Sequence, residues 1–220
     1  MVKKTASLPH ILLLPSFYPV AEESLYGIFF QEQAHLLKNA GIQIGVIYPE
    51  IRELKAFTPR LFLKNHFQFS HVIEKELPIM RKHGWNLSPG FLRGTMKLWV
   101  RSSITLYKKY VAEYGKPDII YAQSALWAGV AAQAISEKFN LPYVVVEHRD
   151  NFLHEHLFDN GIHQKWLTKV LNVAFAKAKQ VVAVSTALKK GMARYIQNSE
   201  ILVIPNFMDT TSFQQKDKVD

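Results

Sequence analysis

The stretch PHILLLPSFYPVAEESLYGIFFQEQAHLLKNAG, residues 9–41, decides the fold. Its apolar run Ile11–Leu14 has the length of a strand and stops at Pro15. A loop follows as far as Gly27, after which apolar residues recur at helical spacing up to Gly41. A second apolar run begins directly afterwards, so the stretch predicts a strand–helix–strand unit with a right-handed crossover. Ligands bind at the carboxyl ends of strands in such sheets, which makes the loop after Pro15 the first candidate site.

The rest of the chain continues this alternation outside residues 50–90, which are irregular in pattern. Short apolar runs predict strands, and longer segments with helical periodicity predict helices. The expected strands are 42–48, 118–122, 143–148, 180–185 and 200–205, with 67–73 and 77–85 as further candidates, and the expected helices are 89–114, 126–139, 163–179 and 186–196. The fold class is therefore α/β: a Rossmann-like, doubly wound, mostly parallel sheet of six to seven strands with helices on both faces.

Composition excludes several classes of protein. The chain has 220 residues, 48% of them hydrophobic and none of them cysteine. Disulfides, thiolate nucleophiles and cysteine-ligated metals are excluded, and the composition fits a cytoplasmic protein. No apolar run reaches the 18 or so residues of a membrane-spanning helix. The two lysines before Ile11–Leu14 resemble a signal peptide, but the run is too short and continues into a fold.

Positive charge is concentrated in one segment. The chain carries a formal charge of +9, and residues 51–115 hold 12 Lys or Arg against 4 Asp or Glu. This excess predicts an anionic partner such as phospholipid headgroups, a phosphorylated substrate or nucleic acid. Arg93, Lys97 and Arg101 are spaced by four on the predicted helix 89–114, so they share one face. They form a candidate membrane or acceptor patch, or else a solvated helix face.

Polar residues follow several predicted strands. Because the carboxyl ends of parallel strands meet at one edge, these residues should surround one crevice, although strand ends are also polar simply because they reach solvent. They are Ser16, Gln123, Ser124, Glu147, His148, Arg149, Asp150, Ser185 and Asn206. His148 is the candidate catalytic residue, because imidazole can donate to a sugar hydroxyl or take up a proton near neutral pH.

Other chemical patterns carry little weight. Glu147 and Glu155 need not share a helix, and His154, His156 and His163 lack the carboxylate–histidine spacing of a known metal site. GxGxxG after the first strand, GxxxxGK[ST] and GxSxG are all absent. We therefore expect no metal and no ordinary dinucleotide or P-loop site.

Three segments together resemble the N-terminal domain of family 4 retaining glycosyltransferases, which have the GT-B architecture. Residues 11–47, ILLLPSFYPVAEESLYGIFFQEQAHLLKNAGIQIGVI, resemble the family's opening strand, its P-S-[WF]-Y-P loop and a helix ending in AG. AKAKQVVAVSTALKKGM (176–192) resembles the segment whose strand ends in V-S, and ILVIPNFMDTTSF (201–213) resembles the closing V-I-P-N-G-V-D segment. DIIYAQ (118–123) and VVVEH (144–148) add to the match, which covers most of the chain outside residues 50–115.

The resemblance implies transfer of a sugar from a nucleotide-sugar donor to a glycan or lipid-linked acceptor. The configuration at the anomeric carbon would be retained, and no metal cofactor would be needed. Residues 1–207 would be the acceptor-binding domain and 208–220 the start of a linker, the donor-binding domain being absent. Such a fragment alone should be inactive. His148 matches the histidine near the donor sugar. The substrate-binding candidates are Ser16, Tyr26, Gly27, Gln123, Arg149, Ser185 and Asn206.

Two residues depart from the family pattern. Tyr26 precedes Gly27 where the family often has two glycines, and Phe207 replaces the glycine after Asn206.

An alternative function is a non-catalytic module that binds anionic membrane through the basic patch. Nucleic acid is a poorer partner, because the aromatic residues follow core spacing and no recognition motif appears.

Overall fold

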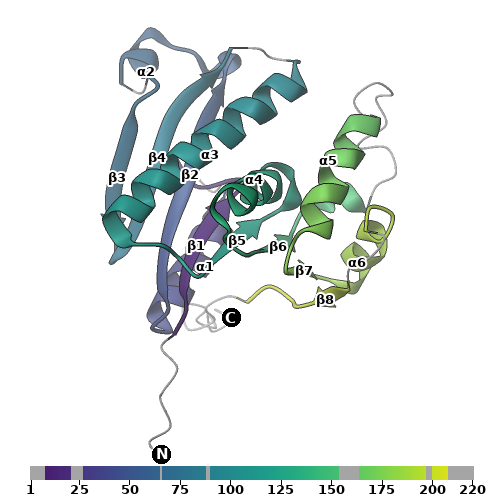
Figure 1. Ribbon diagram of the computed structural model, residues 1–220. Coiled ribbons are helices and arrows are strands. Elements are labelled where there is room, and N and C mark those ends of the chain that lie inside the picture. The colour runs from purple at the N-terminus through teal and green to yellow at the C-terminus, as the bar shows by residue number, and fades with distance from the viewer. Residues whose placement is uncertain are drawn as a thin grey trace, which may run out of the picture.

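The computed structural model describes residues 8–20, 27–64, 66–87, 90–153, 164–196 and 200–207. Within these residues the strands form one sheet in the order β3-β4-β2-β1-β5-β6-β7-β8 (Figure 1). The strands are β1 (His10–Pro15), β2 (Gln43–Glu53), β3 (Phe69–Glu74), β4 (Leu77–Asn86), β5 (Ile119–Gln123), β6 (Tyr143–Glu147), β7 (Gln180–Ala183) and β8 (Ile201–Val203). All neighbouring pairs are parallel except β3 and β4, which are antiparallel. The predicted α/β, mostly parallel sheet is confirmed.

Helices cover both faces of this sheet. They are α1 (Ile28–Asn39), α2 (Pro59–Lys64), α3 (Leu92–Tyr114), α4 (Val130–Phe139), α5 (Gln164–Ala176) and α6 (Thr186–Met192), with short helical turns η1 (Leu54–Ala56), η2 (Ala125–Gly129) and η3 (Asp150–Phe152). One buried cluster joins α3, α4, α5 and α6 to the face nearer the viewer in Figure 1. A second cluster joins α1 to the opposite face, around Leu13 and Val46.

Strand sequences explain the two clusters. Leu12, Leu13 and Leu14 of β1 are all fully buried, because a central parallel strand packs on both faces. Each such side chain stabilises the fold by roughly 1.5–3 kcal/mol through burial. Gly45 of β2 lies under Tyr110 of α3, and a Cβ there would come within 2.3 Å of the Tyr110 ring. This close approach lets the Tyr110 hydroxyl reach Nε2 of His10 at 2.7 Å.

The structure corrects several element boundaries. The sheet has eight strands in the described residues, not six or seven, because 69–74 and 77–86 pair as a hairpin whose turn residues Lys75 and Glu76 have positive φ. β2 extends to Glu53, five residues beyond its predicted end. The helix expected from Leu126 begins properly only at Val130, since Leu126 itself has extended backbone angles.

Candidate functional site

The loop after β1 is joined to η2 by one buried hydroxyl. Ser16 Oγ donates to the Leu126 carbonyl at 2.9 Å and accepts from the Ala128 N–H at 3.2 Å. The Ser16 N–H also donates to the Gln123 carbonyl at 3.1 Å. The predicted crevice therefore has a fixed floor, in which the Ser16 hydroxyl already has two protein partners.

A second buried group, Glu147, organises the same floor. Its Oε1 accepts from the N–H groups of His148 at 3.0 Å and Arg149 at 2.9 Å, and its Oε2 accepts from the Ala125 N–H at 2.7 Å. Burial raises the pKa of Glu147, and these N–H groups and Arg149 oppose that rise. The carboxyl group thus joins the end of β6 to the start of η2 and fixes the backbone of both candidate residues that follow it.

His148 lies on the α1 side of this floor. Its ring packs edge-on against Phe29 and Phe30, with centroid distances of 5.5 and 5.1 Å. Burial lowers the pKa of His148 to about 4, although the nearby Asn206 side chain favours the protonated form. Neither ring nitrogen makes a hydrogen bond of normal geometry to any described residue. At neutral pH the imidazole is therefore neutral, with one donor and one acceptor nitrogen that are both buried from solvent.

Arg149 lies against the loop that follows β1. Its guanidinium lies 5.2 Å from the centroid of the Phe17 ring. Its Nη1 donates to the Leu126 carbonyl at 3.3 Å, and its Nε donates to Asn151 Oδ1 at 3.1 Å. These contacts hold the arginine against the same loop that Ser16 fixes.

On the α3 side a cavity of about 250 Å³ opens at the carboxyl ends of β1, β2 and β4. We call it the carboxyl-edge cavity. Its lining residues are Ser16, Phe17, Tyr48, Pro49, Ile51, Glu53, Asn86, Thr95, Trp99 and Trp127. Aromatic faces together with carboxylate, amide and hydroxyl groups suit a sugar ring, which has apolar faces and polar edges.

Most of this cavity lining was missed from the sequence. Trp127 follows β5 within the segment expected to be regular helix, and Glu53 belongs to the unexpected extension of β2. Trp99 and Thr95 look like ordinary core and surface positions of a helix. Asn86, at the end of β4, follows the strand-end pattern that singled out Ser16, and it could have been found by that signal.

Gly27 has a packing role. It precedes α1 with φ of +83°, and a Cβ there would lie 2.8 Å from both the Cα and the N of Tyr18. Glycine alone combines this left-handed angle with so close an approach. Tyr26, the other candidate of this loop, lies outside the described residues.

The remaining candidates are spread more widely. Gln123 is fully buried, and its Nε2 donates to Gln33 Oε1 at 2.8 Å, so its amide faces the interior. Ser185 is exposed at the N-cap of α6, where Oγ accepts from the Leu188 N–H at 3.1 Å. Asn206 is exposed beside His148.

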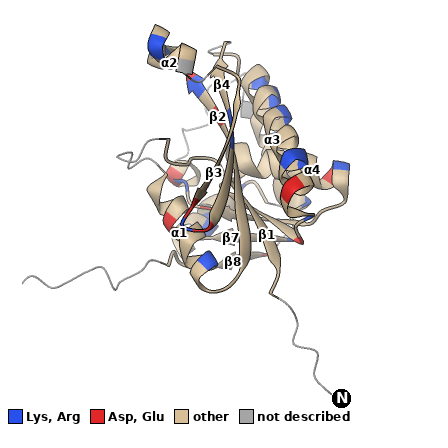
Figure 2. Cartoon of the chain, turned by 90° about the vertical axis from the view of Figure 1, so that its left-hand side faces the viewer, with Lys and Arg blue, Asp and Glu red and all other residues tan. Residues whose placement is uncertain are grey.

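The basic patch lies apart from these residues, along α3. Arg93, Lys97 and Arg101 are all exposed, and Figure 2 shows Lys and Arg positions in a row on this helix. The Arg93 guanidinium lies 5.3 Å from the Trp166 ring centroid of α5. The three cations of the patch are therefore accessible to solvent.

The described ranges also bear on metal binding and on membrane insertion. Within them, no three His, Asp or Glu side chains gather as metal ligands would. Glu155, His154, His156 and His163 lie outside those ranges. No helix in the described part of the chain has the length and hydropathy of a transmembrane span.

Comparison with known proteins identifies the family of the chain. Residues 27–212 match the family described as Glycosyltransferase Family 4. TuaC of Bacillus subtilis strain 168, which is named for a glycosyltransferase role in teichuronic acid biosynthesis, is 27% identical over 212 residues. The match covers 93% of this chain and 51% of TuaC, so the chain spans about half the length of that relative.

Solved structures show the same fold at low identity. A sucrose-phosphate synthase of Thermosynechococcus elongatus aligns with a TM-score of 0.56 at 14% identity, covering 89% of this chain and 88% of the other. A UDP-glucosyltransferase of Polygonum tinctorium aligns with a TM-score of 0.55 at 13% identity, covering 97% and 56%. On its family match, the chain belongs to Glycosyltransferase Family 4.

Proposed function

We propose that this chain is the acceptor-binding half of a retaining glycosyltransferase that uses a nucleotide-sugar donor. The observation that carries the proposal is the pairing of two features at one sheet edge. His148 presents a neutral imidazole without a protein hydrogen bond in the described residues, and the carboxyl-edge cavity offers aromatic and polar walls. Family membership and coverage of about half of TuaC support a longer protein with a separate donor domain.

The roles of the residues follow from their surroundings. His148 hydrogen-bonds a hydroxyl of the transferred sugar, and the carboxyl-edge cavity receives the acceptor. As the glycosyl–phosphate bond breaks, negative charge grows on the departing diphosphate, so a fixed cation such as Arg149 favours that step. Asn206 orients His148, while Tyr26, Gly27 and Ser185 border the donor side. Ser16 and Gln123 support the floor from within.

We further propose that the acceptor is a glycan or a lipid-linked glycan of cell-surface polysaccharide, made on the cytoplasmic side. TuaC, named for teichuronic acid biosynthesis, supports this class of acceptor. A second domain would close over the cleft and exclude water, which would otherwise hydrolyse the donor. The 220-residue chain alone should then be inactive.

The test uses the longer protein that the proposal requires, with panels of UDP- and GDP-sugars and released nucleoside diphosphate as the readout. His148→Ala should lower kcat by about 100-fold, the size expected for losing one hydrogen-bond donor in a transfer site. His71→Ala, at the far edge of the sheet, is the matched control and should keep wild-type turnover. Unchanged turnover in a folded His148→Ala protein would remove His148 from the site.

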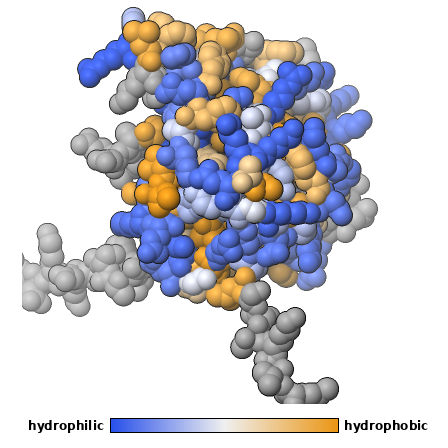
Figure 3. Space-filling view, turned by 60° about the vertical axis from the view of Figure 1, so that its left-hand side comes forward, coloured by the Kyte–Doolittle hydropathy of each residue, from blue (hydrophilic) through white to orange (hydrophobic). Residues whose placement is uncertain are grey.

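A specific observation favours a second candidate function, contact with anionic membrane. Exposed apolar side chains gather over η1 and α2, at the top of the molecule in Figure 3, and the basic patch lies on α3. The apolar residues are Leu54, Phe57, Phe62 and Leu63. Apolar side chains beside cations are the combination that binds a lipid interface.

Co-sedimentation with phosphatidylglycerol vesicles tests this function. Changing Arg93, Lys97 and Arg101 together to Glu should abolish binding that wild type shows at low salt. The control changes Lys138, Lys179 and Lys190, three exposed lysines on other surfaces, to Glu. Equal losses in both triple variants would mean that only net charge matters and that the patch has no specific role.

A further inference from the structure

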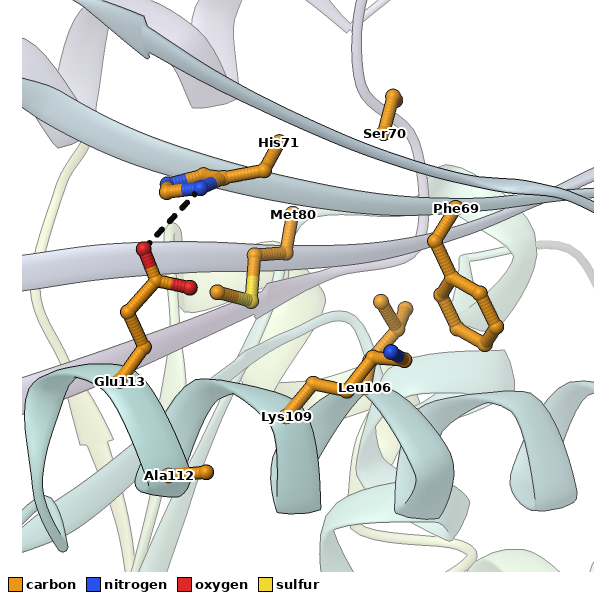
Figure 4. A pocket seen from close by; sticks show the side chains of 8 residues that line it. All are labelled: Phe69, Ser70, His71, Met80, Leu106, Lys109, Ala112 and Glu113. Carbon is orange, nitrogen blue, oxygen red and sulfur yellow. Dashed lines mark ion pairs between the residues drawn. The ribbon is translucent and has the colours of Figure 1, made fainter.

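A second, larger cavity of about 470 Å³ lies between the β3–β4 hairpin and the C-terminal half of α3 (Figure 4). Its lining residues are Phe69, Ser70, His71, Met80, Leu106, Lys109, Ala112 and Glu113. None of them lines the carboxyl-edge cavity. We call this the hairpin cavity.

The floor of the hairpin cavity is apolar, although polar and charged side chains also line it. Leu106 is fully buried and Met80 nearly so, and they separate the two ends of the cavity in Figure 4. His71 pairs with Met80 across the hairpin, and Phe69 pairs with Lys82, so these side chains project from the α3 side of the sheet. The apolar part of a ligand could therefore be buried against Met80 and Leu106 without displacing water from a charged group.

The two ends of the cavity differ in charge. At one end Glu113 Oε1 lies 3.2 Å from His71 Nδ1, so the carboxylate of Glu113 has a partner. The Tyr114 hydroxyl lies 2.6 Å from Nε2 of the same histidine. At the other end the Phe69 ring centroid lies 4.5 Å from Lys109 Nζ and 5.8 Å from Lys82 Nζ.

Neither of these lysines has an ion-pair partner among the described residues. No described carboxylate therefore offsets the positive charge of the two ammonium groups beside the Phe69 ring, and an anion bound near them would be attracted to both. This end of the cavity therefore favours a negatively charged group.

From this arrangement we propose that the hairpin cavity binds a single-chain anionic amphiphile. Its alkyl chain lies over Met80 and Leu106 beneath α3, and its phosphate or carboxylate lies between Lys82 and Lys109. The volume, the apolar floor and the unpaired cations at one end together specify this class of ligand. The site is separate from the candidate transfer site and stands whether or not the chain is half of a transferase.

Calorimetric titration of the 220-residue chain with decyl phosphate, below its micelle concentration, tests the proposal. Wild type should show saturable binding at one site. Ala112→Phe fills the cavity from an exposed position of α3 and should weaken binding at least tenfold. Ala176→Phe, which enlarges an exposed alanine of α5, should bind as wild type does. Equal loss in both variants, or none in Ala112→Phe, would overturn the proposal.

The charged end is tested separately with ligands of the same chain length. Lys109→Gln should weaken decyl phosphate at least fivefold and leave decanol unchanged, whereas Lys108→Gln, its neighbour outside the cavity, should change neither. Equal wild-type affinity for decyl phosphate and decyltrimethylammonium would overturn the assignment of an anion. Binding to phosphatidylglycerol vesicles but not to decyl phosphate would show a membrane surface instead and overturn the single-chain site.

Discussion

Two buried glutamates at the carboxyl side of the sheet are stabilised in opposite ways. Glu147 of β6 accepts from three backbone N–H groups, at His148, Arg149 and Ala125. Glu50 of β2 instead pairs with the side chains of Arg52 and Arg81, the latter at 3.8 Å, and lies 3.2 Å from Nδ1 of His83, whose pKa burial lowers to about 4. The first therefore determines the path of the main chain, and the second determines the positions of other side chains.

Both glutamates act on the same loop after β1. Glu147 fixes η2, and Ser16 of the loop bonds to η2. Glu50 holds Arg81, whose Nη1 donates to the Pro19 carbonyl at 2.6 Å and whose guanidinium lies 5.2 Å from the Tyr18 ring centroid. The wall of the candidate site is thus fixed at one end through backbone and at the other through side chains.

The largest effect is expected for Glu147→Ala. It leaves three buried N–H groups without an acceptor, which should lower the free energy of unfolding by about 4 kcal/mol. Glu147→Gln keeps one acceptor oxygen and should cost about 2 kcal/mol. Urea denaturation measures both, and a loss below about 1 kcal/mol for the alanine variant would contradict the backbone role of Glu147.

Arg81→Met should cost about 2–3 kcal/mol, because Glu50 keeps Arg52 and His83 while the contacts to Tyr18 and Pro19 are lost. A double-mutant cycle with Glu50→Gln should give a coupling of about 1–3 kcal/mol. Lys82→Met, at the next position of β4, is the matched control and should change stability by less than about 0.5 kcal/mol. Additive effects in the cycle would show that Glu50 does not hold Arg81.

Gly27→Ala should cost about 2 kcal/mol, since it combines left-handed strain with contact against the Tyr18 backbone. Gly90→Ala is a suitable control, because Gly90 also has φ of +83° but has open space around it. That variant should cost only about 1 kcal/mol, which is the strain alone. Equal thermal shifts in the two variants would mean that the close approach to Tyr18 contributes nothing.

The smallest effect concerns pH. The folded pKa of His148, about 4, is below the value of about 6.5 in an unfolded chain, so the unfolded state binds more protons between these values. The contribution of neutral His148 to the free energy of unfolding is present above pH 6.5 and is lost as the pH falls toward 4. Wild type should lose about 1 kcal/mol more than His148→Gln between pH 7 and 5.5. Parallel losses in urea titrations at the two pH values would contradict the buried, neutral state of His148.

Features that depend on the pattern of a single strand could be predicted from the sequence. The leucine run of β1 and the valine run of β6 specify strands buried on both faces, so the positions of Ser16 and His148 at strand ends follow directly. Features formed where distant segments meet could not be predicted in this way. The contacts of His148 with Phe29 and Phe30, and of Glu147 with Ala125, join residues from different elements. Pattern within one segment carries no information about such pairings.

The hairpin shows the same limit. Residues 69–74 alternate weakly, and as an edge strand β3 exposes Val72 and Ile73, so burial does not determine its pattern. Its pairing with β4 depends on a turn at Lys75 and Glu76, two residues that are not typical of positive φ. Both the eighth strand and the hairpin cavity therefore required the structure.

The most direct test of the central claim, that the acceptor binds in the carboxyl-edge cavity, fills the two cavities in turn from the same helix. In the longer protein, Thr95→Trp fills the carboxyl-edge cavity and Ala112→Trp fills the hairpin cavity. Release of nucleoside diphosphate from UDP- and GDP-sugars in the presence of acceptor should fall at least tenfold in a folded Thr95→Trp protein and stay unchanged in Ala112→Trp. Full activity in Thr95→Trp, or loss confined to Ala112→Trp, would contradict the account.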